Sequence, residues 1–130
     1  MDRKIFSGLL CIMMLTFALN TAEVSRSYAD QSKLAQVIYI TVSKACGCTL
    51  DRCRAGDWVV EKVFVGEKKA LLKRLDYATE KDAAREYITK YRLAMPPSLL
   101  FLDKDGNLLW RADGELDQDL VAEKLKEFGA

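Results

Sequence analysis

The segment from Val37 to Cys53 reads VIYITVSKACGCTLDRC and carries the pattern that decides the fold. Its first six residues, 37–42, are β-branched or aromatic and run without polar alternation, which is typical of a strand buried on both faces of a sheet. Three cysteines follow within eight residues, at Cys46, Cys48 and Cys53. The segment therefore predicts a central strand that delivers a group of thiols to one end of a sheet.

The rest of the chain alternates helical and extended patterns. Asp57 is predicted to cap a helix over 58–65 that directs Trp58, Val59, Val63 and Phe64 towards a core, and Gly66 is expected to end it. Residues 70–77 form a second predicted strand, and a helix from Thr79 repeats apolar residues at helical spacing (Ala84, Tyr87, Ile88 and Tyr91).

The last part of the chain predicts a hairpin and a helix. Residues 98–102 and 107–110 read as strands, and the turn sequence 103–106 joins them. Asp117 is predicted to cap a final helix whose apolar stripe is Val121, Leu125 and Phe128. The order β-α-β-α-β-β-α predicts an α/β fold, with a mixed four-stranded sheet between helices on both faces. Strands joined through helices are expected to be parallel, and the hairpin antiparallel.

Residues 1–29 read as a signal peptide. Arg3 and Lys4 precede a mostly apolar run over 5–19, and the small residues Ser27 and Ala29 have the spacing that a signal peptidase accepts. Cleavage after Ala29 would leave a domain over 30–130 in the periplasm or outside the cell. An uncleaved N-terminal anchor is the alternative, although the run is shorter than the roughly 20 residues of a spanning helix.

The amino-acid composition excludes several classes of function and catalytic site. The 130 residues hold 20 Lys and Arg against 19 Asp and Glu, so a basic surface for nucleic acid is not expected. The absence of histidine excludes Ser-His and Cys-His catalytic pairs and every metal site that needs an imidazole. No heptad or amphipathic interface indicates oligomerisation, and a monomer is expected.

The order of elements, with Cys46 after the first strand and Pro97 opening the third, resembles the thioredoxin family over essentially all of 30–130. Gly47 resembles the glycine that follows the family's active-site cysteine. The segment Pro97-Ser98-Leu99 resembles its proline-threonine-leucine segment, which implies a cis peptide bond before Pro97. The resemblance implies a thioredoxin-like fold and redox-active cysteines, with Pro97 and Ser98 beside the substrate.

The cysteine motif departs from the family's usual Cys-x-x-Cys pattern. Cys48 occupies the place of its proline, and Thr49 stands where the second cysteine would be. The buried acidic residue that many thioredoxins carry in the first strand would fall near Ile40 and is absent. Ordinary thioredoxin behaviour therefore cannot simply be transferred to this chain.

Cys46 is the predicted nucleophile. A following helix and the nearby cations Lys44, Arg52 and Arg54 would favour its thiolate. A bond between Cys46 and Cys48 would close a cramped ring and be relatively oxidising. A bond between Cys48 and Cys53 needs a loop, because a helix separates them by about 7.5 Å in rise alone. Gly56 and Asp57 indicate such a loop, over 45–56.

Two functions follow from these thiols. In the first, the protein is a thiol-disulfide oxidoreductase of thioredoxin type: Cys46 attacks, Cys48 or Cys53 resolves, and protein thiols or disulfides are the partners. An exported reductase would also need a membrane redox donor or acceptor. Action as an oxidant, a reductant or an isomerase depends on the reduction potential and the partners.

The second function is metal binding on the same scaffold. Cys46, Cys48 and Cys53 would supply three thiolates, which suit Cu(I) better than Zn²⁺ because Zn²⁺ prefers four ligands. Asp51 could complete a zinc site, and Met95, expected near the cysteines, could offer a thioether to Cu(I). The redox function needs no bound cofactor.

Overall fold

A computed structural model describes residues 33–130. Its elements in chain order are β1 (Gln36–Thr41), α1 (Gly47–Val63), the 3₁₀ helix η2 (Gly66–Leu71), β2 (Leu72–Asp76), α2 (Lys81–Tyr91), β3 (Ser98–Leu102), β4 (Leu108–Asp113) and α3 (Gln118–Glu127). The predicted order is confirmed, with η2 added before β2. The predicted signal peptide, Cys11 included, lies outside the described residues. Among residues 33–130, no helix is long and apolar enough to span a bilayer.

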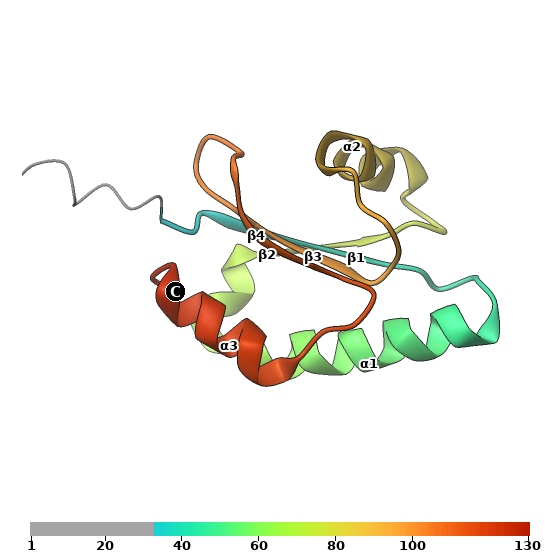
Figure 1. The fold of residues 1–130 in the computed structure, drawn as a ribbon, viewed down its shortest axis with the longest axis horizontal. Coiled ribbons are helices and arrows are strands. Elements are labelled where there is room, and N and C mark those ends of the chain that lie inside the picture. The colour runs from blue at the N-terminus through green and yellow to red at the C-terminus, as the bar shows by residue number, and fades with distance from the viewer. Residues whose placement is uncertain (1–32) are drawn as a thin grey trace, which may run out of the picture. The chain divides into compact units, whose positions relative to one another are not determined.

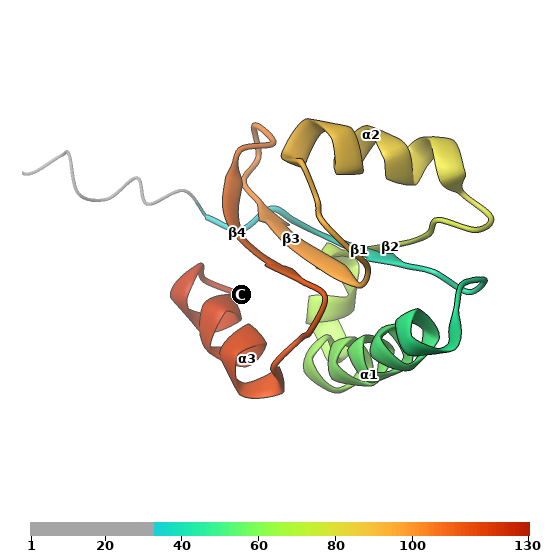
Figure 2. The same ribbon diagram turned by 45° about the vertical axis from the view of Figure 1, so that its right-hand side comes forward.

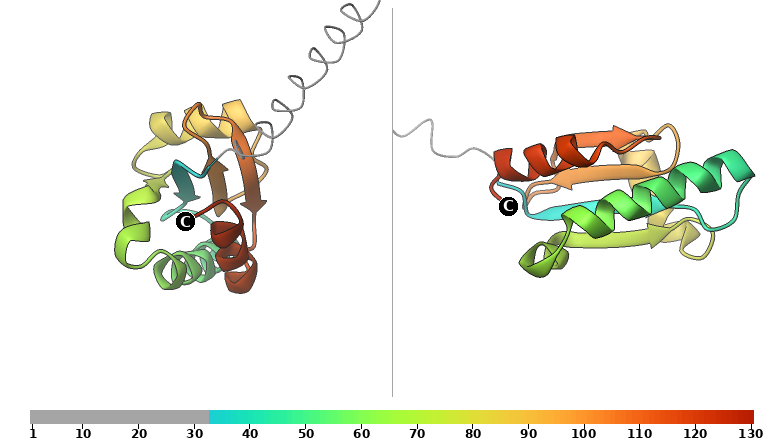
Figure 3. Two further views of the ribbon diagram at one scale, coloured as in Figure 1. Left: turned by 90° about the vertical axis from the view of Figure 1, so that its left-hand side faces the viewer. Right: turned by 90° about the horizontal axis from the view of Figure 1, so that it is seen from below.

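The four strands form one mixed sheet in the order β2-β1-β3-β4. Helices α1 and α3 cover one face and α2 covers the other, as Figure 1 and Figure 2 show. Viewed from below in Figure 3, α1 and α3 lie across the same face of the sheet. This is the predicted layered arrangement.

The direction of β3 corrects one prediction. Strands β1 and β2 are parallel, but β3 runs antiparallel to β1 although a helix connects it to β2. Leu75 of β2 and Ser98 of β3 both pair with Ile40, so β3 begins at the edge where β2 ends. The segment 92–97 returns the chain to that edge after α2, and this return reverses the strand.

Side-chain alternation along the two central strands builds a core on each face. Val37 and Tyr39 of β1, with Leu99 and Phe101 of β3, pack against α1 and α3. The residues between them point to the other face, where Ile38, Ile40, Leu100 and Leu102 pack with Leu75 and Ala84. Because both strands are buried on both faces, their sequences are continuously apolar.

The start of α1 corrects a second prediction. The helix begins at Gly47 directly after Cys46, so the expected loop over 45–56 does not exist. Gly56 is buried inside the helix, and a Cβ there would lie 2.8 Å from both Pro97 Cγ and the Tyr39 hydroxyl. This glycine serves close packing and does not break the helix.

Two other predictions about α1 are wrong. Asp57 lies within the helix and is not its cap. Trp58 is 55% exposed, whereas Val59, Val63 and Phe64 are buried as expected. A helix that begins eleven residues before Trp58 presents this side chain to solvent and not to the sheet.

The C-terminal predictions are confirmed. The Asp117 side chain accepts a hydrogen bond from Leu120 N (2.7 Å) and caps α3, whose Val121 and Leu125 are buried. Gly106 closes the turn between β3 and β4 with φ of 79°, a conformation that glycine adopts without steric cost.

Candidate functional site

Cys46 lies at the N-terminus of α1, just beyond the end of β1. It is the N-cap residue, with extended backbone angles (φ −63°, ψ 157°), and its carbonyl accepts hydrogen bonds from the Thr49 and Leu50 amides. The thiol is exposed. The first amides of a 17-residue helix therefore surround Cys46, and their partial positive charge favours a thiolate.

Hydrogen bonds stabilise the thiolate of Cys46 directly. The bond from the Thr49 hydroxyl has the largest effect, followed by that from the Cys48 thiol, and together with the Thr49 amide they lower the pKa of Cys46 from 9.0 to about 7. The Thr49 Oγ1 lies 3.2 Å from the Cys46 Sγ. The sequence pattern missed Thr49, although position i+3 from an N-cap is where such a partner is expected.

The predicted contribution of nearby cations is not what lowers this pKa. Arg54 forms an exposed ion pair with Asp51 (3.3 Å). Arg52 extends towards the loop before β3, where its Nη1 donates to Met95 Sδ (3.0 Å). Local hydrogen bonds at the helix N-terminus account for the shift.

Cys48 is the partner that the structure brings to Cys46. Their sulfur atoms lie 3.2 Å apart, and both side chains are exposed. This separation exceeds the S–S bond length of about 2.05 Å, so the two thiols are free and adjacent.

Cys53 is separated from this pair. It is 2% exposed and lies on α1, about 10 Å along the helix from Cys46 and about 7.5 Å from Cys48. Two cysteines at these separations on a regular helix cannot bond. A bond between Cys48 and Cys53 would need a loop in this region, and the structure has a continuous helix there.

The three predicted thiolate ligands are not brought together either. Within residues 33–130, no group of three Cys, Asp or Glu side chains is close enough to hold a metal ion. Asp51 faces Arg54, and Met95 faces Arg52. A site for Cu(I) or Zn²⁺ stays a prediction that no contact in the described chain favours.

Pro97 ends the loop before β3 and packs against Gly56 in the middle of α1, and Ser98 begins β3 and lines the same cavity as Thr49. The Pro96–Pro97 peptide bond is cis, and Pro97 is fully buried, with its carbonyl accepting from Gly114 N (2.8 Å). The Ser98 hydroxyl lies 2.7 Å from Asp113 Oδ1 and 3.0 Å from the Met95 carbonyl. Both residues hold the loop in place, and direct contact with a substrate stays a prediction.

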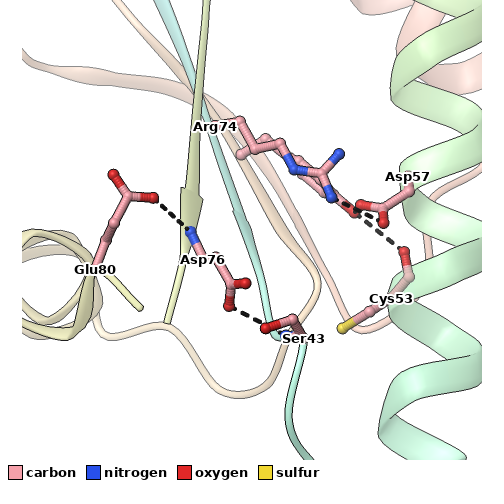
Figure 4. A network of polar contacts seen from close by, with 7 residues as sticks. Ser43, Cys53, Asp57, Arg74, Asp76 and Glu80 are labelled. Carbon is pink, nitrogen blue, oxygen red and sulfur yellow. Dashed lines mark hydrogen bonds and ion pairs between the residues drawn. The ribbon is translucent and has the colours of Figure 1, made fainter. Parts of the chain in front are cut away.

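A polar network that the sequence patterns did not predict connects the sheet to α1 near the site (Figure 4). The Tyr39 hydroxyl donates to Asp57 Oδ1 (2.8 Å) and lies 3.3 Å from the Cys53 carbonyl, and Arg74 pairs with Asp57 at 2.9 Å. Burial and the Asp57 carboxylate raise the pKa of Tyr39 well above its ordinary value, so the hydroxyl stays protonated. The network links β1 and β2 to the middle of α1.

Asp76 anchors the segment that leads to Cys46. It accepts hydrogen bonds from the Ser43 amide (3.1 Å) and the Ala78 amide (2.9 Å). Partial burial alone would raise the pKa of Asp76, but its bonds to Ser43 and Ala78 and the Arg74 cation hold that pKa below its ordinary value. A charged Asp76 therefore ties the end of β2 to Ser43, three residues before Cys46 (Figure 4).

A cavity of about 620 Å³ opens beside the cysteines, on the α2 side of the sheet. Its walls come from the segment before Cys46, the start of α1, helix α2 and the loop before β3. They include Ile40, Lys44, Ala45, Thr49, Arg85, Ile88, Leu93, Met95, Pro96 and Ser98. Since Thr49 contacts both the cavity and Cys46, a molecule bound here would lie next to the reactive thiol.

No protein-family model matches the sequence, and no curated protein matches it either. Solved structures match its fold. Thioredoxin from Aeropyrum pernix is 19% identical with a TM-score of 0.51, and the match covers 74% of this chain and 75% of that chain. The reduced C-terminal domain of DsbD from Neisseria meningitidis is 14% identical with a TM-score of 0.54, and the match covers 75% and 84%. The chain therefore has a thioredoxin-like fold.

Proposed function

We propose that this chain is an exported thiol-disulfide oxidoreductase in which Cys46 is the nucleophile and Cys48 the resolving cysteine. The observation that carries the proposal is the environment of Cys46: an exposed thiol at a helix N-terminus, with a pKa of about 7 and a second thiol at 3.2 Å. A thiol with a pKa near neutrality combines a large thiolate fraction with good nucleophilicity. The solved structures of similar fold, a thioredoxin and a DsbD domain, support the same class.

The reaction proceeds by two exchanges. The Cys46 thiolate attacks one sulfur of a substrate disulfide, the substrate S–S bond breaks, and the departing thiolate takes up a proton. Cys48 then loses its proton and attacks the Cys46 sulfur of the mixed disulfide. The products are a Cys46–Cys48 disulfide and a substrate dithiol, so the enzyme loses the two electrons that the substrate gains. The reverse sequence oxidises a substrate dithiol.

Export rests on the pattern over residues 1–29. In an oxidising compartment the cysteine pair would need a redox partner to return it to its starting state. A reductase there would draw electrons from a membrane donor, and an oxidase would pass them to a membrane acceptor. Protein thiols or disulfides are the proposed substrates.

The test is a set of serine variants at the three cysteines, made in the full chain with Cys11→Ser so that only these thiols react. Each reduced protein is mixed with a disulfide-bonded peptide, and the released peptide thiol is followed in a single turnover. Cys46→Ser is expected to abolish the reaction. Cys48→Ser should attack but not resolve, and should accumulate a peptide-protein mixed disulfide at Cys46.

Cys53→Ser is the matched control, because Cys53 is buried and out of reach of the pair. It should reduce the peptide at a rate close to that of the parent. Unchanged activity of Cys46→Ser would contradict the assignment of the nucleophile. A mixed disulfide that accumulates in Cys53→Ser and not in Cys48→Ser would make Cys53 the resolving residue.

A further inference from the structure

We propose that the cavity beside Cys46 selects substrates that carry a carboxylate close to the reacting sulfur. The inference rests on the proposed function, because it names the class of disulfide that the same site prefers. The acid could be a Glu or Asp side chain next to a cysteine in a protein, or the free carboxylate of a small thiol compound.

The charged side chains that line the cavity are all positive. Lys44 and Arg85 line the cavity, and among residues 33–130 no Asp or Glu does. Neither cation takes part in an ion pair within the described part of the chain, whereas Arg54, Arg74 and Arg111 each pair with an aspartate. Two uncompensated positive charges therefore face a space large enough for several side chains.

Arg52 adds a third cation at the rim. Its guanidinium contacts Met95, a residue of the cavity wall, through a bond from Nη1 to the thioether sulfur at 3.0 Å. A thioether is a weak acceptor, and the buried Nε of Arg52 has no hydrogen-bond partner within residues 33–130. An incoming carboxylate would be a better acceptor for this group than the sulfur is.

The apolar part of the wall strengthens this selection. Ile40, Ile88 and Leu93 line the same cavity as the two cations and can cover the aliphatic part of an acidic side chain. Beside an apolar wall the effective dielectric constant is lower than in bulk water, so an ion pair is worth more than on an open surface. The sulfur of the same substrate residue, or of its neighbour, would lie against Thr49 and Cys46.

The test compares three disulfide-bonded peptides that differ only in the residue before each cysteine: Glu, Gln or Lys. Reduced full chain with Cys11→Ser is mixed with each peptide at low and at high salt, and the second-order rate constant is divided by that of dithiothreitol. We expect the Glu peptide to react about three- to tenfold faster than the Gln peptide at low salt, with the Lys peptide slowest, and salt to reduce these ratios.

The double variant Lys44→Gln/Arg85→Gln should lower the ratio of Glu to Gln peptide by about half or more, and adding Arg52→Gln should bring the ratio close to one. Lys69→Gln is the matched control: it also removes a positive charge, but from η2, at the opposite end of the sheet, and it should keep the ratio of the parent. Glutathione disulfide provides the second arm. A preference for it over its tetramethyl ester, which carries no carboxylate, that the double variant weakens would identify small anionic thiols as substrates as well.

The outcomes separate the two proposals. Equal rates for the Glu and Gln peptides, or a preference that the double variant leaves undiminished, would overturn the charge selection and leave the oxidoreductase intact. Failure to reduce any of the disulfides would overturn the proposed function itself. The salt dependence of the unmodified chain tests the charge selection without any variant, so a folding defect cannot mask the result.

Discussion

Replacing Gly56 by alanine should destabilise the fold, although the same change inside a helix is normally favourable by up to about 1 kcal/mol. A Cβ at this position would lie 2.8 Å from Pro97 Cγ and 2.8 Å from the Tyr39 hydroxyl. The proline ring is rigid and buried, and the tyrosine hydroxyl is held by Asp57. Overpacking of this kind costs about 1 to 3 kcal/mol, and disturbing a buried hydrogen bond costs about 1 kcal/mol more. After the gain in helix propensity, we expect a net loss of about 1 to 3 kcal/mol.

Urea denaturation of the reduced parent and variant, monitored by circular dichroism, measures this difference in the free energy of unfolding. The two proteins can be compared directly if their m-values agree. Gly47→Ala is the matched control, because a Cβ at Gly47 would meet nothing within 4 Å. It should leave stability unchanged or raise it by less than about 1 kcal/mol. A Gly56→Ala variant as stable as the parent would refute the close packing of α1 against the loop that carries Pro97.

Further predictions concern the cysteines and the support of the site. The rate of Cys46 alkylation by iodoacetamide should rise with pH around an inflection near 7, because the thiolate is the reacting form and the folded pKa is about 7. Thr49→Val should move this inflection to higher pH and slow alkylation at pH 7 about three- to tenfold, whereas an unchanged inflection would contradict the role of its hydroxyl. Cys53→Ala should cost about 1 kcal/mol of stability through a small cavity but should leave the pH profile of Cys46 unaltered. Tyr39→Phe should lower the free energy of unfolding by about 1 kcal/mol, measured by urea denaturation; no change would show that the bond to Asp57 contributes nothing.

Sequence patterns predict the layers of this fold because strands that are buried on both faces need continuous runs of apolar residues. The apolar runs over 37–42 and 98–102 match two strands that are buried on both faces. Capping by Asp117 and the turn at Gly106 are also predictable, since each depends on a few neighbouring residues. The direction of β3 is not predictable in this way, because it depends on the path of 92–97 across the sheet.

The site is harder to predict where one residue serves two purposes. Gly56 and Asp57 resemble a helix boundary in sequence, but a distant proline and tyrosine determine their roles in the structure. For the same reason the sequence groups Cys53 with the other two cysteines, although the continuous helix buries it. The sequence leaves open whether Cys48 or Cys53 is the partner of Cys46, and Lys44 and Arg85 come together only through the packing of α2 against the sheet.

The most direct test of the central claim is to map the disulfide that forms when the full chain with Cys11→Ser is equilibrated with a glutathione redox buffer. Acid quenching, alkylation of free thiols and peptide mass spectrometry would identify the linked residues, and the native intact mass of a separate sample, neither quenched nor alkylated, would report any bound metal. We predict a chain lighter by two hydrogens, with Cys46 joined to Cys48 and with Cys53 alkylated only after unfolding. A linkage that includes Cys53, or a chain that retains copper or zinc on all three thiolates, would contradict the claim.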